Sequence, residues 1–600
     1  MRVWPVVLGA VVAAMGCAAA QGDAMQAPMP VTPELLVRIK SEAERGDVDA
    51  QVTLAYAYAQ GEGVERDMAA AVKWWRRAAA SGDAAAQYML ALVYFNGDGV
   101  EADAAQGRAW LRRAAEAGMA RAQAGLGELY LMGEGVPVDY AEAVQWLSKA
   151  AYQNHAVAQY QLGWCYMQGN GVEADAAEAC RWLRASALLG YAPAMLAVGI
   201  AYLEGEGVEK DVDEGLRFLK AAADLDEPEA LVQLAACYGE GLYGVQPNAE
   251  AAFRYARLAA EQGVAQAQFA LGDMYEAGRG VRADAAEAVR WYRAAAEQGV
   301  AQAQFALATM YDEGQGVQAD AAEAVRWCRA AAEQGLAPAQ VMLAQACLHG
   351  VGTPQDAAEA ARWARAAAEQ GVPEAQYLMG LFCLQGLGVP EDAAEAARWN
   401  AAAAEQGFAE AQFNLGCQYM RGEGVGVDRE KAASLWLAAA EGGHARAQYN
   451  VGLACLQERG MRHSPEEAVR WLSAAAEQGD AQALLILSHC YATGTGVEAD
   501  VEQMLACRRR AADMGLAEAQ RYMGEAYLRG EGVKADDAQA VRWLLAAAEQ
   551  DDAPACYHLG LCYLHGRGLP ADEDKGVAML RRAAELGVDE AAQLLRRMNK

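Results

Sequence analysis

Apolar and small positions recur along this chain with a period of 36 residues. Within residues 265–278, Ala267, Leu271 and Tyr275 are spaced by four residues, so their side chains lie on one face of a predicted helix. A second helical pattern, DAAEAVRWYRAAAEQG, follows at residues 284–299. Because the link to the next unit is only a few residues long, the two helices are predicted to be antiparallel neighbours. We call them helix A and helix B of each repeat.

A GxGV turn separates the two helices of each repeat. The first glycine of the turn, Gly278, suits the left-handed residue that ends a helix. Asp284 is a typical N-cap residue, and Glu287 three positions later predicts a complete capping box; this copy is one of eleven in which Glu or Gln stands at that spacing. The second glycine of the turn recurs at Gly63, Gly99, Gly135, Gly171, Gly207, Gly244, Gly280, Gly316, Gly352, Gly388, Gly424, Gly460, Gly496, Gly532 and Gly568.

Fifteen copies at a fixed period predict one stacked array rather than several globular domains. The position of Ala267 is alanine in every copy, and that of Gly272 is always Gly, Ala or Ser. A residue this small at every copy indicates close passage of another helix backbone. A tryptophan such as Trp291 recurs in most B helices. It could form an aromatic box, but a packing residue at helical spacing is the favoured interpretation.

Two copies depart from this pattern. One residue is inserted between Gly241 and Gly244, which predicts a bulged loop that presents Tyr243 to solvent. In a later copy Glu458 replaces the first glycine, which predicts a less regular turn.

The ends of the chain predict segments outside the array. The chain begins with a positively charged end at Met1-Arg2, followed by an apolar run and a candidate cleavage site made of small residues. This order of features predicts an N-terminal signal peptide. The complete division is signal peptide 1–20, linker 21–31, N-terminal capping helix 32–46, repeat array 47–587 and C-terminal capping helix 588–600.

Ordinary cleavage of the signal peptide is the favoured interpretation. Alternatively, Ala14-x-Gly16-Cys17 is similar to the lipobox of bacterial lipoproteins, in which Cys17 would be lipidated. Both alternatives predict an exported chain, periplasmic or secreted, with no transmembrane span in the mature protein.

Composition narrows the partner class. The formal net charge is -30, which argues against nucleic acid as a partner and is typical of a solvated outer face. Thirteen cysteines are present, and many replace core residues of other copies, as Cys347 replaces a tyrosine. Free buried thiols are therefore favoured over a regular disulfide framework.

The full pattern of the repeat is A-x-x-x-L-G-x-x-Y-x-x-G-x-G-V-x-x-D-x-x-x-A-x-x-W-x-x-x-A-A-x-x-G. This pattern resembles the Sel-one-like repeat, a relative of the tetratricopeptide repeat. This resemblance implies an all-α fold, an α/α solenoid of about fifteen 36-residue helix-turn-helix repeats forming a right-handed superhelix with A helices on its concave side. Proteins similar to this one act as adaptors or scaffolds for other proteins, and exported bacterial members are linked to envelope or host interactions.

No catalytic, metal or cofactor motif stands out from the repeat. The seven histidines have no zinc-binding spacing, and His558 with Cys562 on one helical face is only a weak metal pattern beside a core thiol and a surface imidazole. No S-x-x-K, G-x-S-x-G or P-loop motif occurs. We therefore predict that the protein is not an enzyme. The alternative is an envelope hydrolase or a β-lactam-binding enzyme, which would need an exposed nucleophile beside a base.

One helix A position varies from copy to copy while its neighbours stay constant, namely the seventh residue before the second glycine. A variable position on a constant scaffold predicts a groove that holds a protein or peptide. The alternative is that these side chains fill space between adjacent A helices. The apolar residues at this position in the first part of the array are Tyr56, Leu92, Trp164 and Ile200.

Overall fold

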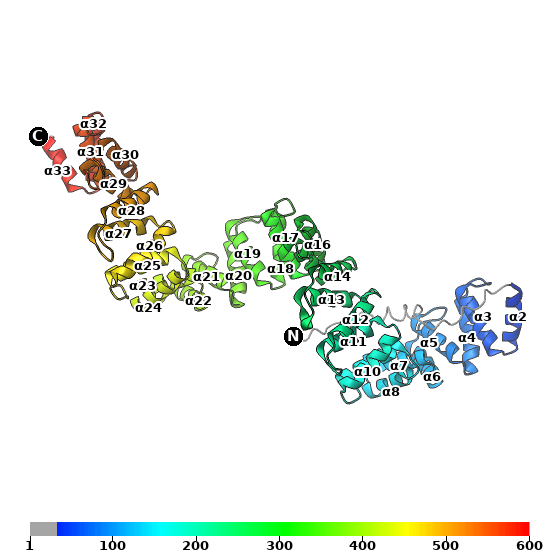
Figure 1. Cartoon of the computed structure of the whole chain (residues 1–600). Coiled ribbons are helices and arrows are strands. Elements are labelled where there is room, and N and C mark those ends of the chain that lie inside the picture. The colour runs from blue at the N-terminus through cyan, green and yellow to red at the C-terminus, as the bar shows by residue number, and fades with distance from the viewer. Residues whose placement is uncertain (1–32, 599–600) are drawn as a thin grey trace. The chain divides into compact units, whose positions relative to one another are not determined.

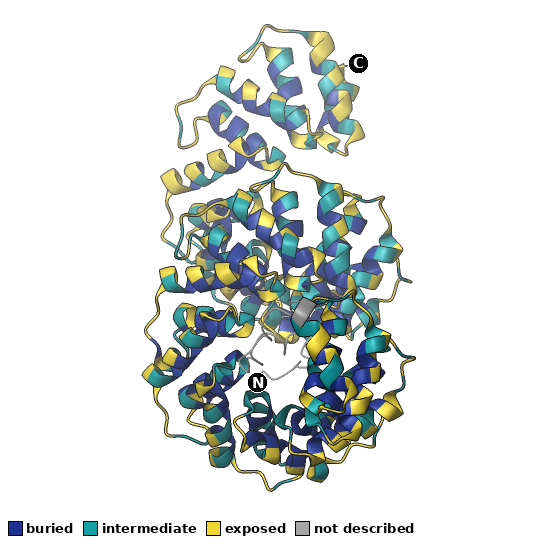
Figure 2. Cartoon of the chain, turned by 90° about the vertical axis from the view of Figure 1, so that its right-hand side faces the viewer, coloured by how far each residue is buried: buried dark blue, intermediate teal, exposed yellow. Residues whose placement is uncertain are grey.

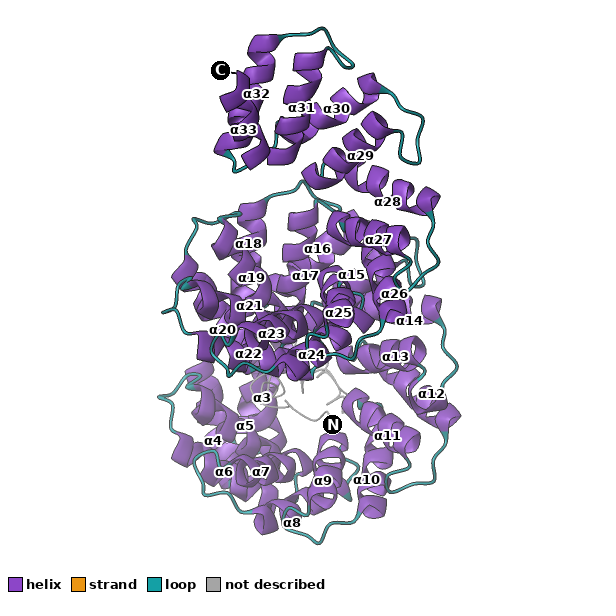
Figure 3. Ribbon diagram, turned by 90° about the vertical axis from the view of Figure 1, so that its left-hand side faces the viewer, coloured by secondary structure: helices purple, strands orange, loops and turns teal. Residues whose placement is uncertain are grey.

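The computed structural model describes residues 33–598, which form helices joined by loops, with no strand in this range (Figure 3). The predicted signal peptide (1–20), the linker (21–31) and Cys17 lie outside the described residues. Two compact units divide the chain, one ending at Asp284 and the other beginning at Ala285. Figure 1 follows the helices of both units by colour along the chain.

The first unit begins with α2 (Pro33–Glu44). Its A helices are α3 (Val48–Gln60), α5 (Ala84–Asn96), α7 (Ala120–Met132), α9 (Ala156–Gln168), α11 (Ala192–Glu204), α13 (Pro228–Glu240) and α15 (Ala265–Ala277). Its B helices are α4 (Met68–Ala80), α6 (Ala104–Glu116), α8 (Tyr140–Ala151), α10 (Ala176–Leu188), α12 (Val212–Ala223) and α14 (Ala249–Glu261), and the short 3-10 helix η1 (Leu242–Gly244) follows α13.

The second unit continues the alternation and ends with α33 (Asp589–Met598). Its A helices are α17 (Ala301–Glu313), α19 (Ala337–His349), α21 (Pro373–Gln385), α23 (Ala409–Arg421), α25 (Ala445–Gln457), α27 (Ala481–Thr493), α29 (Ala517–Arg529) and α31 (Ala553–His565). Its B helices are α16 (Ala285–Glu297), α18 (Ala321–Glu333), α20 (Ala357–Glu369), α22 (Ala393–Glu405), α24 (Arg429–Glu441), α26 (Pro465–Glu477), α28 (Val501–Asp513), α30 (Asp537–Ala548) and α32 (Glu573–Glu585). The predicted all-α array of paired helices is confirmed.

The GxGV turn ends helix A as predicted, but only half of the capping box forms. Gly350 follows α19 with a left-handed φ of 71°, and the Asp356 side chain accepts a 2.9 Å hydrogen bond from the Glu359 amide. The Asp356 amide, however, donates to the carbonyl of Cys347 at 2.9 Å. The Glu359 carboxylate is therefore not needed to accept a hydrogen bond from the Asp356 amide. It pairs instead with Arg329 of the preceding repeat. The prediction of a complete capping box is wrong at this copy.

Close backbone approach explains two of the small residues in each repeat. A Cβ placed on Gly163 of α9 would lie 2.8 Å from Leu183 and 3.1 Å from the Ala179 carbonyl oxygen, both in α10. The predicted close passage of a helix backbone is confirmed. At the second glycine of a turn, Gly352, a Cβ would overlap the backbone carbonyl of Ala321, where the preceding B helix begins. This glycine therefore permits contact between successive repeats.

Buried residues, dark blue in Figure 2, lie on the sides of the helices that face neighbouring helices. The tryptophans of the B helices belong to these cores: Trp74 and Trp146 are buried within hydrophobic clusters. Their predicted packing role is confirmed. The twelve cysteines among the described residues are free thiols, and ten of them are buried, including Cys347. The preference for buried thiols over disulfides is thus confirmed for the described part of the chain.

Paired glutamines connect successive repeats. The side-chain amide of Gln340 in α19 donates to the Ala332 carbonyl at 3.1 Å, and its Oε1 accepts a 2.8 Å hydrogen bond from Gln370, which follows α20. Each such glutamine thus connects its A helix to the B helices before and after it. The same arrangement joins Gln123 to Gln153, Gln304 to Gln334, Gln376 to Gln406, Gln448 to Gln478 and Gln520 to Gln550.

The glutamine pair is incomplete in three early repeats. Oε1 of Gln51, Gln87 and Gln159 is buried without a hydrogen-bond partner. The reason is the residue 30 positions later, which is Ser81, Ala117 and Leu189 respectively, instead of glutamine.

Both irregular turns differ in part from their prediction. Tyr243 is half-exposed, and its hydroxyl donates a 3.2 Å hydrogen bond to Glu204, so its side chain faces solvent only in part. Tyr243 adopts a positive φ of 58°, and its hydroxyl lies within hydrogen-bond distance of Gln233 as well as Glu204. Glu458 takes the left-handed conformation of the glycine it replaces, with φ 55° and ψ 34°. The backbone path of that helix end is therefore retained.

Candidate partner-binding face

The four residues predicted to line a groove are all half-buried. Tyr56, Leu92, Trp164 and Ile200 occupy equivalent positions on α3, α5, α9 and α11. Tyr56 also packs edge-on against Trp75 of α4, with 5.6 Å between the ring centroids. This position therefore contributes to the interior and to the surface of the A helices at the same time.

Three aromatic side chains form a continuous row around one of these residues. Tyr160 contacts Trp164, its neighbour one turn along α9, with centroids 6.2 Å apart. Its other side contacts Tyr191, the residue directly before α11, at 5.2 Å. All three side chains are half-buried. We call Tyr160, Trp164 and Tyr191 the aromatic row.

Carboxylates flank the aromatic row. Glu128 of α7 holds the position equivalent to Trp164, and Glu227, directly before α13, holds that of Tyr191. The pKa of Tyr191 is raised to about 12, mainly because its phenol is buried. Electrostatic interactions with Tyr160, Glu227 and Glu128 add to this rise, so both carboxylates lie within electrostatic range of the phenol. We call Glu128, Glu227 and the aromatic row together the acid–aromatic face.

Neither carboxylate is held by an ion pair in the described part of the chain. Burial raises the pKa of Glu128. Burial and a hydrogen bond with Glu229 raise the pKa of Glu227 to about 7. Within the described residues, neither these two carboxylates nor that of Glu229 forms an ion pair with a lysine, arginine or histidine. The face is therefore both aromatic and electron-rich, with carboxyl groups whose ionised form is disfavoured by their surroundings.

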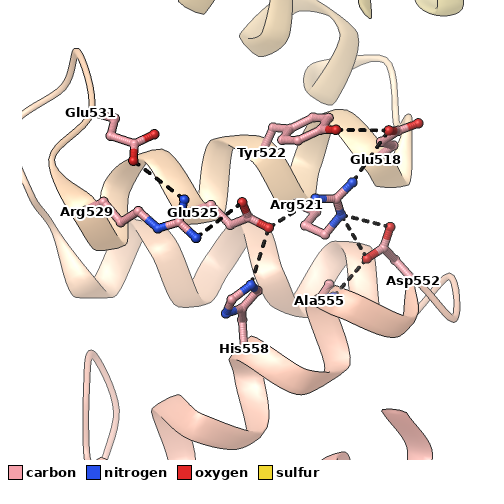
Figure 4. A network of polar contacts seen from close by, with 9 residues as sticks. All are labelled: Glu518, Arg521, Tyr522, Glu525, Arg529, Glu531, Asp552, Ala555 and His558. Carbon is pink, nitrogen blue, oxygen red and sulfur yellow. Dashed lines mark hydrogen bonds and ion pairs between the residues drawn. The ribbon is translucent and has the colours of Figure 1, made fainter. Parts of the chain in front are cut away.

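A second polar cluster, on α29 and α31, is compensated internally (Figure 4). Arg521 stands where other repeats have an apolar or aromatic residue such as Tyr160, and only 14% of its side chain is exposed. Its guanidinium pairs with Glu525 at 3.1 Å and with Asp552 at 3.3 Å, while His558 approaches Glu525 at 3.4 Å.

Burial alone would raise the pKa of Glu525, but hydrogen bonds from His558 and Arg521 outweigh it and hold the pKa at about 2. Glu525 occupies the same variable position as Trp164. The variable position thus serves an internal ion network in this repeat.

The sequence of the whole array matches one family model. Fifteen consecutive segments between residues 48 and 588 each match the Sel1 repeat. The chain belongs to the Sel1 repeat family. Among solved structures, it is similar to the protective antigen c5321 of uropathogenic Escherichia coli strains, which has an SLR fold, with 32% identity and a TM-score of 0.55; the match covers 82% of this chain and 97% of that one.

A Sel1 repeat protein from Oxalobacter formigenes is 30% identical with a TM-score of 0.44, over 55% of this chain and 93% of that one. No curated protein matches the chain. The resemblance noted in the sequence is confirmed by the repeat matches.

Sequence reasoning missed part of the face that the Sel1 repeats build. Tyr191 and Glu227 stand at the residue before helix A, where other repeats carry Asp, Val, Leu, Met, Phe or His. Variation at this second position was a usable indicator, because a residue that only caps a helix has little reason to change so widely. Tyr160 looked like an ordinary core residue, since aromatic side chains recur at its position.

The described Sel1 repeats contain no group of three His, Cys, Asp or Glu residues that could hold a metal ion. His558 faces Glu525, whereas Cys562 is buried in a hydrophobic cluster, so the two side chains of this weak pattern have different surroundings. Burial raises the pKa of all twelve described thiols, that of Cys165 and Cys237 to about 11. These thiols are therefore protonated at neutral pH.

No helix in the described range has the length and apolar character needed to cross a bilayer.

Proposed function

We propose that this chain is a non-catalytic scaffold that binds a protein or peptide on the exposed face of its A helices. The observation that supports this proposal is the acid–aromatic face itself. Half-buried tyrosine and tryptophan rings are typical of interface anchors, because they offer large contact area at little cost in conformational entropy. The surrounding Sel1 repeats hold these rings in place through helix pairs that contact both neighbours.

The proposed location is the cell envelope or the extracellular space. The segment 1–20 has the features of a signal peptide, and Cys17 offers a site for a lipid anchor. The similar protein c5321 is described as a protective antigen, which supports an exported chain. Mass spectrometry of the purified protein from its native envelope would show either a cleaved N-terminus near Gln21 or a lipid-modified Cys17, and an intact Met1 would contradict export.

Binding is tested by replacing two apolar residues at the variable position of the A helices, one of which belongs to the acid–aromatic face. Peptides that bind the wild-type chain are first selected from a synthetic array of 15-residue peptides. We expect the double variant Trp164→Asp with Ile200→Asp to bind these peptides at least about tenfold more weakly, since buried interface anchors contribute about 2 kcal/mol or more each. A matched control places aspartate at Val138 and Val351, which are half-exposed loop residues.

Circular dichroism establishes that both double variants are folded. Unchanged peptide affinity in a folded variant with aspartate in place of both Trp164 and Ile200 would show that the A-helix face is not the binding surface.

A further inference from the structure

Two glutamates in this chain show opposite responses to similar burial. Glu525 is paired with Arg521 and His558, and its pKa falls to about 2. Glu227 has another carboxylate, Glu229, as its hydrogen-bonding neighbour, and its pKa rises to about 7. The difference lies in the cations: one site contains its own, and the other has none within ion-pair distance among the described residues.

A cation supplied by a ligand would remove this imbalance. A positive charge beside Glu128 or Glu227 would favour the ionised form of that glutamate, just as Arg521 does for Glu525. The rings of the aromatic row add a second attraction, because the negative faces of Tyr and Trp rings bind cations within about 6 Å of their centroids. The net charge of -30 also attracts basic segments from a distance.

Resting on the binding function proposed above, we propose that the acid–aromatic face binds a basic segment of a partner protein, with an arginine or lysine side chain lying against the aromatic row beside one of its flanking carboxylates, Glu128 or Glu227. Arginine fits better than lysine. Its planar guanidinium stacks on aromatic rings and pairs with a carboxylate through two parallel hydrogen bonds, whereas the lysine ammonium is a compact and strongly hydrated charge. The partner is therefore recognised by charge and by planar stacking together.

Three labelled peptides test this proposal on the full chain. Each has eight residues with blocked termini and the same alanine and leucine background; positions 2, 5 and 8 are arginine, glutamine or glutamate. Fluorescence anisotropy measures their Kd at low salt. We expect the arginine peptide to bind at least about tenfold more tightly than the glutamine peptide, as for a partly desolvated charge pair, and the glutamate peptide to bind most weakly.

Two charge-matched variants separate local recognition from general attraction. Glu128→Gln with Glu227→Gln should weaken arginine-peptide binding about tenfold and leave the glutamine peptide within about twofold. Glu173→Gln with Glu209→Gln removes two charges from exposed loops and should change neither affinity by more than about twofold. The first variant should fold, because burial already disfavours the ionised form of both glutamates.

Tyr191→Leu provides an independent test of stacking, with an expected loss of about threefold for the arginine peptide alone. Equal loss in both charge-matched variants would overturn the proposal, since it would show long-range attraction only. Equal binding of the arginine and glutamine peptides would also overturn it. If that shared binding is abolished by the Trp164 and Ile200 substitutions, the scaffold function stands and only the cation preference is wrong.

Discussion

Replacing Ala117 by glutamine should complete an interrupted hydrogen-bond pair. Gln87 in α5 donates to the Ala79 carbonyl at 3.2 Å, but its Oε1 is buried without a partner. Ala117 is exposed and lies 30 residues later, where six described repeats carry a glutamine that donates to such an oxygen at 2.8 to 2.9 Å. Because alanine contributes little packing there, the substitution adds a donor and removes almost nothing.

The expected gain is about 1 kcal/mol. An unsatisfied buried acceptor costs about 1–3 kcal/mol, and a new net hydrogen bond contributes about 0.5–1.5 kcal/mol. Ordering a glutamine side chain opposes this by up to about 1.5–2 kcal/mol, with the larger value for full burial. The residue at 117 stays partly in solvent, so only part of this entropy is lost.

Urea unfolding and hydrogen exchange over residues 84–132 measure the change globally and locally. Exchange is needed because stability in a repeat array is a sum of local terms and its unfolding need not be two-state. Ala117→Glu is the matched control, since glutamate has similar size without the donor. In a Gln87→Met background the gain from Ala117→Gln should vanish.

A coupling free energy below about 0.3 kcal/mol between positions 87 and 117 would refute the reasoning. That result would mean that water already satisfies the Gln87 oxygen.

Four further predictions test the remaining features. Glu458→Gly should stabilise the second unit by about 1 kcal/mol in urea unfolding, because glycine adopts the left-handed conformation without strain; a loss of stability would contradict this. Arg521→Leu should destabilise by about 2–3 kcal/mol, and adding Glu525→Leu should recover most of it, since the unpaired carboxylate is then removed. The Glu525 pKa of about 2 lies below its ordinary value of 4.5, so its stabilising contribution is complete above pH 4.5 and is lost as pH falls through 2; acid unfolding curves of the wild type and Glu525→Gln should converge there. Arginine-peptide binding should strengthen about tenfold between pH 6 and pH 8 as Glu227 ionises, and Glu227→Gln should flatten that profile; identical profiles would contradict the role of Glu227.

Local chemistry made the repeat predictable from the sequence. The glycine at the end of each A helix, the N-cap aspartates and the apolar spacing act within a few residues of each other, so the pattern alone predicted the helices and the first half of each cap. The small residue at positions such as Gly163 likewise indicated a close helix pair. The groove predicted from the variable position that includes Trp164 stays a prediction, and the pattern gave no information about the neighbours of that residue.

Contacts between repeats were decided by the tertiary structure. Glu359 was predicted to cap its own helix, yet it pairs with Arg329, because stacking brings residues 30 apart within reach. The same stacking places Glu227 beside Tyr191 and Tyr160, which lie 36 and 67 residues earlier in the chain. A 36-residue pattern determines each helix pair, but which side chains meet depends on the rotation and rise between successive pairs. Those parameters come from the packing of the whole interface, and no short stretch of sequence specifies them.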